Sequence, residues 1–150
     1  MSTATYSYET RLAWEGQRRG RLRAEGIPEI TVTTPPEFRG EAGFWTPEHL
    51  FVAAAESCLR ATFLAIAENS RLPVVAYRSE AEGRIERADG AGFRFVELTV
   101  RPVVELESAG DRERAERIMA KAAKGCLITK SMALEVRVEP ELLVRIPAAA

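Results

Sequence analysis

The feature that most constrains this chain is a long apolar segment, residues 45–71, which predicts one continuous helix. Thr46 is a suitable N-cap, Pro47 fits the first helical position, and Glu48 adds a carboxylate where the helix macrodipole is positive. After that first turn, no glycine or proline interrupts the segment before Pro73. At about 1.5 Å per residue the helix would be about 35 Å long, enough to cross a small domain.

The apolar residues of this segment lie on most faces of the predicted helix rather than along one stripe. They are Leu50, Phe51, Ala54, Ala55, Cys58, Leu59, Ala61, Phe63, Ala65 and Ile66. A helix that is apolar on most sides must be covered on most sides, so we expect it at the centre of the fold. Glu56, Arg60 and Glu68 argue against a membrane span, because each would cost about 2.5–3.5 kcal/mol at the bilayer centre. We therefore predict no membrane segment.

Length and composition indicate one ordinary domain. The chain has 150 residues, 46% of them hydrophobic, and a formal net charge of −1. This is enough for a sizeable core and leaves no basic surplus to hold a phosphate backbone. We therefore predict a single domain over residues 1–150 and no nucleic-acid partner. No apolar signal segment opens the chain, and two cysteines without such a signal indicate a reducing cytoplasm.

Alternation of apolar residues and turn signals predict strands on both sides of the long helix. The predicted strands are 3–14, 21–24, 30–34, 74–87, 93–107 and 133–146, and a second helix is predicted at 108–124. Glycine-containing turns join neighbouring strands as hairpins, so we predict an α+β fold with an antiparallel sheet. One sheet covers only one side of the long helix. We therefore expect a second copy of the chain to cover the rest, in an intimate homodimer.

Few side chains could carry chemistry. The single histidine, His49, lies nine residues before Cys58, about 13 Å of helix rise away, too far for a pair on the same helix. Two distant cysteines and one histidine give no ligand-pair spacing for zinc, and no glycine-rich phosphate loop is present. The candidates that remain are the thiols of Cys58 and Cys126.

Each thiol has a plain structural interpretation beside the chemical one. A cysteine in an alanine-rich helix is most often a small buried apolar residue, and the same interpretation applies to Cys126. A reactive thiol needs a nearby cation, and Cys58 lies too far along the helix to gain much from its N-terminal dipole. The candidate cations are Arg18, Arg19 and Arg60, although an arginine-rich turn is usually solvated surface.

Three short segments each carry a recognisable motif. Residues 46–58 place a Pro-Glu pair at a helix start and a cysteine ten residues after the glutamate, and residues 124–131 place a second cysteine after the last helix. Residues 16–20 place an arginine in a G-x-R-x-G-like turn. Together with the element order, these segments resemble the OsmC/Ohr family of osmotically inducible and organic-hydroperoxide-resistance proteins. The resemblance implies an OsmC-like fold, an antiparallel sheet wrapped around a long central helix, and an intertwined homodimer with its sites at the interface.

The resemblance also implies a function and a set of roles. It implies a thiol peroxidase that reduces organic hydroperoxides, and also hydrogen peroxide, without metal, flavin or haem. Cys58 would be the peroxidatic thiolate and Cys126 the resolving thiol. Arg18, or Arg19 if the turn shifts by one, would activate Cys58, and Glu48 would orient that arginine. A dithiol such as a dihydrolipoyl group would reduce the resulting disulfide.

Some details distinguish this chain from the hydroperoxide-specific members. Leu127 follows the second cysteine where those members often have proline, and Glu56 and Arg60 flank Cys58 in a stretch that is usually more apolar. These differences favour the OsmC-like side of the family. Four aromatic residues are candidates for an apolar binding pocket, with plain core packing as the alternative: Phe44, Trp45, Phe51 and Phe63.

The spacing of Glu48 and Cys58 adds a prediction about assembly. They are ten residues apart, about 15 Å along one helix, so both can meet one guanidinium only if Arg18 stretches between them or Glu48 comes from the partner chain. We favour the partner chain. Two other functions remain open: a non-catalytic protein of the same fold that binds a small apolar or acyl ligand at the dimer interface, and a purely structural dimeric module.

Overall fold

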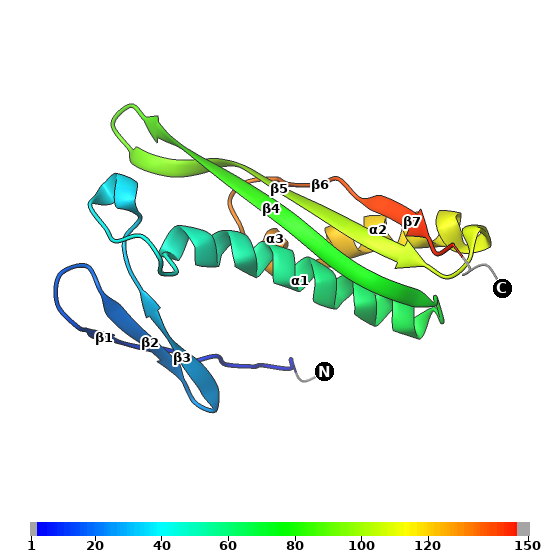
Figure 1. Cartoon of the computed structure of the whole chain (residues 1–150), viewed down its shortest axis with the longest axis horizontal. Helices are drawn as coiled ribbons and strands as arrows, with labels where there is room; N and C mark the ends of the chain where they lie inside the picture. The colour runs from blue at the N-terminus through cyan, green and yellow to red at the C-terminus, as the bar shows by residue number, and fades with distance from the viewer. Residues whose placement is uncertain (1–2, 147–150) are drawn as a thin grey trace. The chain divides into compact units, whose positions relative to one another are not determined.

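The chain folds into two compact units, Met1–Leu50 and Phe51–Ala150, each of which is described by itself (Figure 1). The structure is a computed structural model that describes residues 3–146. It is a mixed α+β protein, as predicted. That residues 1–150 act as a single domain stays a prediction.

The first unit is built on a three-stranded antiparallel sheet with the order β1-β2-β3. Its strands are β1 (Arg11–Trp14), β2 (Gly20–Ala24) and β3 (Ile27–Val32). The first predicted strand was too long, since residues 3–10 have no partner strand and no regular structure. In the turn that follows β1, Gly16 and Gln17 both have positive φ. The indole N–H of Trp14 donates to the carbonyl of Gln17 at 3.0 Å and closes this turn.

A loop leads from β3 to the long helix and contains the short 3-10 helix η1 (Pro36–Phe38). The backbone N–H of Thr33 donates to the carbonyl of Trp45 at 2.9 Å, which ties the two ends of the loop together. Helix α1 (Pro47–Asn69) then begins where predicted. The hydroxyl of Thr46 accepts a hydrogen bond from the backbone N–H of His49 at 3.1 Å, so the predicted N-cap is confirmed.

Helix α1 ends in a left-handed turn. Arg71 has φ 53°, and the N–H of Leu72 donates back to the carbonyl of Ala67 at 2.8 Å, the bond pattern that commonly terminates a helix. The guanidinium of Arg114 donates to the carbonyls of Ser70 (3.1 Å) and Arg71 (3.4 Å). Carbonyls left without helical partners are thereby satisfied by a cation, which is favourable at this end of a helix.

The second unit contains a long hairpin extended by two short strands. Strands β4 (Val74–Ala88) and β5 (Gly92–Leu106) pair antiparallel, whereas β6 (Val136–Val138) and β7 (Glu141–Val144) pair parallel to β5. The prediction of a wholly antiparallel sheet with one final strand was therefore wrong. A helix between β5 and β6 returns the chain to the starting end of β5, which makes the next strand parallel. Pro140 offers no backbone N–H and separates β6 from β7.

The returning helix comes in three pieces. The 3-10 helix η2 (Ala109–Asp111) leads into α2 (Arg112–Gly125), and the four-residue helix α3 (Leu127–Lys130) follows. Cys126 stands at the junction, as the C-cap of α2 and the N-cap of α3. The predicted second helix is confirmed in position, but α3 was not predicted.

One apolar core lies in the second unit, between α1, α2 and one face of β5. Its fully buried members are Ala55, Leu59, Phe63, Ala67, Leu72, Leu98, Val100, Val104, Leu106, Ala115, Ile118, Met119 and Ala122. Those from α1 recur every four residues, and those from β5 are even-numbered, as one helix face and one sheet face require. Gly83 on β4 allows a close approach, because a Cβ there would lie 2.6 Å from Val52 Cγ2 and 2.7 Å from the Phe95 ring.

Among the described residues, α1 is long and apolar enough to meet a length-and-composition test for a membrane span. The core helix of a soluble protein passes the same test. Ala55, Leu59, Phe63 and Ala67 pack into the core described above along one face of the helix. Only 22% of its apolar window is buried among the described residues, so the expected cover on most sides stays a prediction.

Candidate active site

Cys58 and Cys126 come together in the second unit. Cys58 lies on α1, and Cys126 lies between α2 and α3. Both are free thiols, and they are neighbours, since the Cys58 side chain is one of the groups that lower the pKa of Cys126. Two thiols far apart in the sequence are therefore neighbours in the fold, the arrangement that a thiol–disulfide cycle requires.

The sulfur of Cys126 is completely buried, with 0% of the residue exposed. Burial raises the pKa of this thiol, but hydrogen bonds with the Cys58 side chain and with Thr129 and Ile128 lower it by more, so its net pKa lies below the ordinary value. The hydroxyl of Thr129 donates to the Cys126 carbonyl at 3.2 Å. Cys126 is the N-cap residue of α3, so its side chain lies beside the first backbone amides of that helix.

Cys58 has a different environment, since it is half-buried and keeps part of its surface open. The hydroxyl of Thr62, one helical turn later, donates to the Cys58 carbonyl at 2.9 Å and lies 3.9 Å from its sulfur. Of the two sulfurs, Cys58 is therefore the one that a molecule from solvent can reach.

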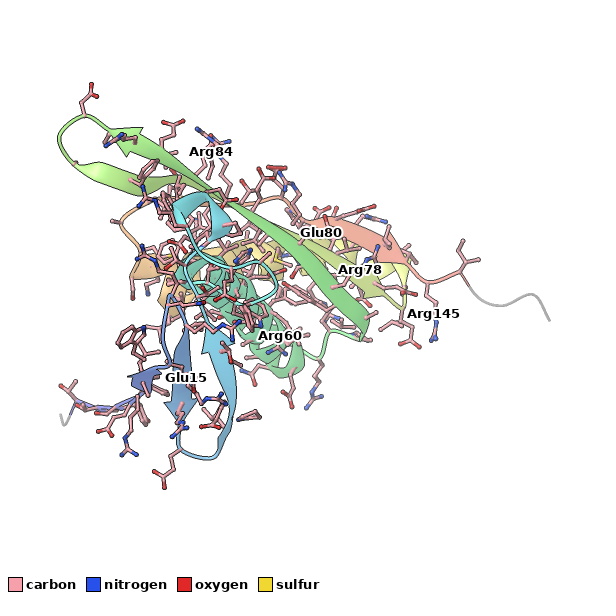
Figure 2. The ribbon with its side chains drawn as sticks, turned by 60° about the vertical axis from the view of Figure 1, so that its left-hand side comes forward. Glu15, Arg60, Arg78, Glu80, Arg84 and Arg145 are labelled. Atoms are coloured by element: carbon pink, nitrogen blue, oxygen red, sulfur yellow. The ribbon has the colours of Figure 1, made fainter. Side chains whose placement is uncertain are left out.

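Glu56 does not point toward a cation. Ser79 on β4 donates to its Oε1 at 2.6 Å, and no ion pair joins Glu56 to Arg60 within residues 3–146. With Tyr77 and Arg78, these residues line a depression of about 280 Å³ (Figure 2, where Arg60 and Arg78 are labelled). Burial, and then the charge of Glu56, raise the pKa of Tyr77 to about 12 against a smaller opposing effect of Arg60. Its hydroxyl is buried and has no hydrogen-bond partner among residues 3–146.

The two arginines of the first turn differ in their partners. Arg19 binds both carboxylate oxygens of Glu41, at 2.6 Å for the shortest contact, and its guanidinium lies 5.1 Å from the centre of the Phe44 ring. This pairing raises the pKa of Arg19 and lowers the pKa of Glu41. Arg18 makes no ion pair or hydrogen bond in the described part of the chain. Arg18 is therefore the one with a guanidinium left for another group.

The cavity beside Arg18 belongs to the first unit and has a volume of about 300 Å³. Its lining comprises Leu12, Trp14, Gln17, Arg18, Arg19, Gly20, Val32, Thr33, Thr34 and Pro47. Glu48 follows Pro47 on α1, and its Oε2 is buried with no hydrogen-bond partner within the described residues. A buried carboxylate oxygen without a partner is costly, so this atom is a site for a cation donor.

The four aromatic candidates lie in three different environments. Phe63 is fully buried, packs on Tyr77 with ring centres 5.8 Å apart, and belongs to the core rather than to the wall of an open pocket. Phe51 is half-buried and stacks on Phe95 at 4.5 Å. Phe44 lies under Arg19, and Trp45 is half exposed. None of the four lines the cavity beside Arg18.

The structure thus brings together two of the four predicted catalytic residues. Arg18 and Glu48 belong to the first unit and the cysteines to the second, so a contact between these pairs stays a prediction. No group of three or more metal-ligating side chains occurs within residues 3–146. The sequence analysis missed Thr62 and Thr129, although their spacing from the cysteines, four and three residues on, is typical of hydroxyls that bond a nearby helical carbonyl.

Comparison with known proteins gives one consistent result. The model of a family described as OsmC-like protein matches residues 40–141. YmaD of Bacillus subtilis (strain 168), described as uncharacterized, is 26% identical over 147 residues, which are 95% of this chain and 97% of YmaD.

Solved structures show the same fold. An OsmC-like protein of unknown function from Vibrio cholerae matches with a TM-score of 0.83 at 22% identity, over 91% of this chain and 99% of that one. An organic hydroperoxide resistance protein OsmC from Legionella pneumophila matches with a TM-score of 0.71 at 23% identity, over 95% and 100%. At these identities the likeness establishes the fold alone.

Proposed function

Since the chain belongs to the family of OsmC-like proteins, we propose that it is a cysteine-based thiol peroxidase that reduces organic hydroperoxides and hydrogen peroxide. The observation that carries the proposal is the pair of neighbouring free thiols, one of them partly open to solvent and the other buried. An isolated structural cysteine needs no such neighbour. Two thiols in contact can be oxidised to a disulfide and reduced again.

The reaction begins at Cys58. Its thiolate attacks one peroxide oxygen, the O–O bond breaks, and the other oxygen takes a proton and leaves as an alcohol or as water. Cys58 is then a sulfenic acid. The sulfur of Cys126 attacks it, a disulfide forms, and the hydroxyl leaves as water. An external dithiol returns both cysteines to thiols by exchange and becomes a disulfide itself.

The proposal gives Arg18 and Glu48 a supporting role. Arg18 has no partner among the described residues, and one oxygen of Glu48 is buried without one. A guanidinium held by that carboxylate would favour the thiolate of Cys58 electrostatically. Glu48 and Cys58 are about 15 Å apart along α1, so we propose a homodimer in which a second copy of the chain supplies the glutamate.

The same chemistry implies a compartment and a reductant. A protein whose disulfide must be reduced in every cycle needs a reducing environment, so the proposal includes the cytoplasm. The reductant is a dithiol, of the dihydrolipoyl type or similar, because its second thiol can complete the exchange within one molecule. No metal or organic cofactor takes part in these steps.

The test is consumption of hydrogen peroxide, tert-butyl hydroperoxide and cumene hydroperoxide with dithiothreitol and with dihydrolipoamide. We expect turnover that Cys58→Ser abolishes and that Ser57→Ala, an exposed neighbour on the same helix, retains. After one equivalent of cumene hydroperoxide, mass spectrometry should find a Cys58–Cys126 disulfide. A protein that consumes no peroxide would contradict the proposal and favour the non-catalytic, ligand-binding alternative.

A further inference from the structure

The two sulfurs differ both in what can reach them and in what surrounds them. Cys126 is 0% exposed, whereas Cys58 is only half-buried. The hydrogen-bond donors lie at the buried sulfur, where Thr129 and Ile128 favour the thiolate of Cys126. The neighbouring donor at Cys58 is the Thr62 hydroxyl, which already donates to a carbonyl at 2.9 Å. A bond between these sulfurs is therefore asymmetric in its surroundings.

We propose that a thiol reductant opens the disulfide by attacking Cys58 and expelling Cys126, and that Thr129 is a positioning residue that stabilises the leaving sulfur. The inference rests on the proposed function and names the sulfur through which the reductant enters. The buried sulfur is closed to an incoming thiolate.

The electrons and protons balance with a dithiol as the only co-reactant. Its thiolate forms a bond to Cys58 Sγ as the Cys58–Cys126 bond breaks, and the electron pair of that bond stays on Cys126. The second thiolate of the dithiol then attacks the sulfur bound to Cys58 and closes a cyclic disulfide. Cys58 leaves as a thiolate. The dithiol is oxidised by two electrons, the protein disulfide is reduced by two, and the two protons pass from the dithiol to the protein thiols.

Thr129 is suited to this role by its present hydrogen bond. Its hydroxyl donates to the carbonyl of the same residue that would carry the leaving charge, at 3.2 Å. A change of side-chain rotamer turns the hydroxyl from that carbonyl to the sulfur when charge develops there. The backbone amides of Ile128 and Thr129, at the start of α3, complete the set of donors.

The direct test is to trap the first intermediate. The wild-type protein is oxidised to the disulfide with diamide, mixed briefly with glutathione, and quenched with excess N-ethylmaleimide in denaturant at mildly acidic pH for peptide mass spectrometry. We expect glutathione on Cys58 and the alkyl group on Cys126. Glutathione found mainly on Cys126 would overturn the inference.

The role of Thr129 is tested by the rate of this reduction. Thr129→Val should slow it about fivefold, the effect of one lost hydrogen bond of ordinary strength, while the rate of Cys58 oxidation by peroxide stays the same. Thr129→Ser should restore the wild-type rate. Ser131→Ala, which removes an exposed hydroxyl of the same segment, is the control. Equal rates for Thr129→Val and Ser131→Ala would contradict the role of Thr129.

The inference and the proposed function can fail separately, because diamide forms the disulfide without a peroxide. If glutathione binds Cys58 but the protein consumes no peroxide, the inference holds and the proposed peroxidase activity is contradicted. If the protein turns over peroxide but glutathione binds Cys126, the proposed activity holds and the inference is contradicted. If diamide forms no disulfide, both are contradicted.

Discussion

The two units of the chain are stabilised in different ways. Every fully buried large apolar side chain among the described residues belongs to the second unit. The first unit instead leaves apolar side chains in solvent, with Trp14 78% and Leu12 64% exposed. What it has in place of a core is a set of ion pairs, which join Arg21 to Glu15 and Glu29, Arg23 to Glu29, and Arg19 to Glu41.

This difference shows which unit contributes most of the stability. Exposed ion pairs contribute little to stability, because solvent screens them and two long side chains must be ordered. A small sheet with one uncovered apolar face is marginal alone. The stable core therefore lies in the second unit. Arg18, which has no partner among the described residues, lies in the first.

The largest expected effect comes from opening the core. Phe63→Ala in the second unit should lower the free energy of unfolding by about 3–5 kcal/mol, since it leaves a cavity in close-packed surroundings. Leu12→Ala in the first unit should change the stability of the monomeric chain by less than about 1 kcal/mol, because most of the side chain is already in solvent. Urea unfolding of both variants at low protein concentration is the measurement. Equal losses of unfolding free energy in the two variants would contradict the difference in stability between the units.

The next effect comes from overpacking the second unit at Gly83. Gly83→Ala places a methyl group where Val52 and Phe95 already lie, so we expect a loss of about 1–3 kcal/mol in urea unfolding. Gly125→Ala is the matched control, because nothing lies within 4 Å of its Cβ position and alanine favours a helix. The control should be neutral or stabilising, and a loss there as large as at Gly83 would exclude close packing as the cause.

A smaller effect is expected at Tyr77, whose hydroxyl is buried without a partner. Tyr77→Phe removes that cost and should raise the free energy of unfolding at pH 7 by up to about 1 kcal/mol. The raised pKa of about 12, against an ordinary 10.0, adds a pH dependence. The unfolded phenol ionises first, so the wild type loses stability as pH rises from about 10 toward 12.

The Tyr77→Phe variant should lack that alkaline loss. Chemical unfolding at pH 9 and pH 11 therefore compares the slope of both proteins over the range where the phenol titrates. Tyr6→Phe, an exposed tyrosine, serves as the control. A variant that loses stability between these pH values as steeply as the wild type would show that another group is responsible.

The smallest expected effect lies in the first unit, at the pair of Arg19 and Glu41. The lowered pKa of Glu41 means that its contribution is complete above its ordinary value of 4.5 and is lost as pH falls through the lowered value. Glu41→Gln should remove this acid-side slope and leave stability at neutral pH nearly unchanged. Thermal unfolding from neutral pH to pH 3 measures it, with Glu37→Gln as the control in the same loop. If the loss of stability at acid pH persists in Glu41→Gln, another carboxyl group is its cause.

The sequence predicted the second unit better than the first, for a physical reason. Helix α1 and the β4–β5 hairpin are set by local signals: a capping threonine, a proline stop, and strict alternation on β4. Strands β6 and β7 depend on a partner reached through a helix, and hairpin rules say nothing about such pairs. Residues 3–10 alternate like a strand but find no partner, which no local pattern could reveal.

The candidate site divides in the same way. The thiols could be selected by elimination, but the contact between Cys58 and Cys126 followed from a family resemblance and not from their spacing. The choice between Arg18 and Arg19 depended on Glu41, a residue with no sequence signal for that pairing. Thr129 and Thr62 had a local signal, since each lies one turn after a cysteine, and it was overlooked.

The uncovered apolar side chains of the first unit have a consequence for how this protein behaves on dilution. A segment whose described residues bury no large apolar side chain takes much of its folding free energy from surfaces beyond its own fifty residues. If a second copy provides that surface, the order of this segment follows mass action. Its amide exchange would then quicken as the protein is diluted, while that of β5 would not.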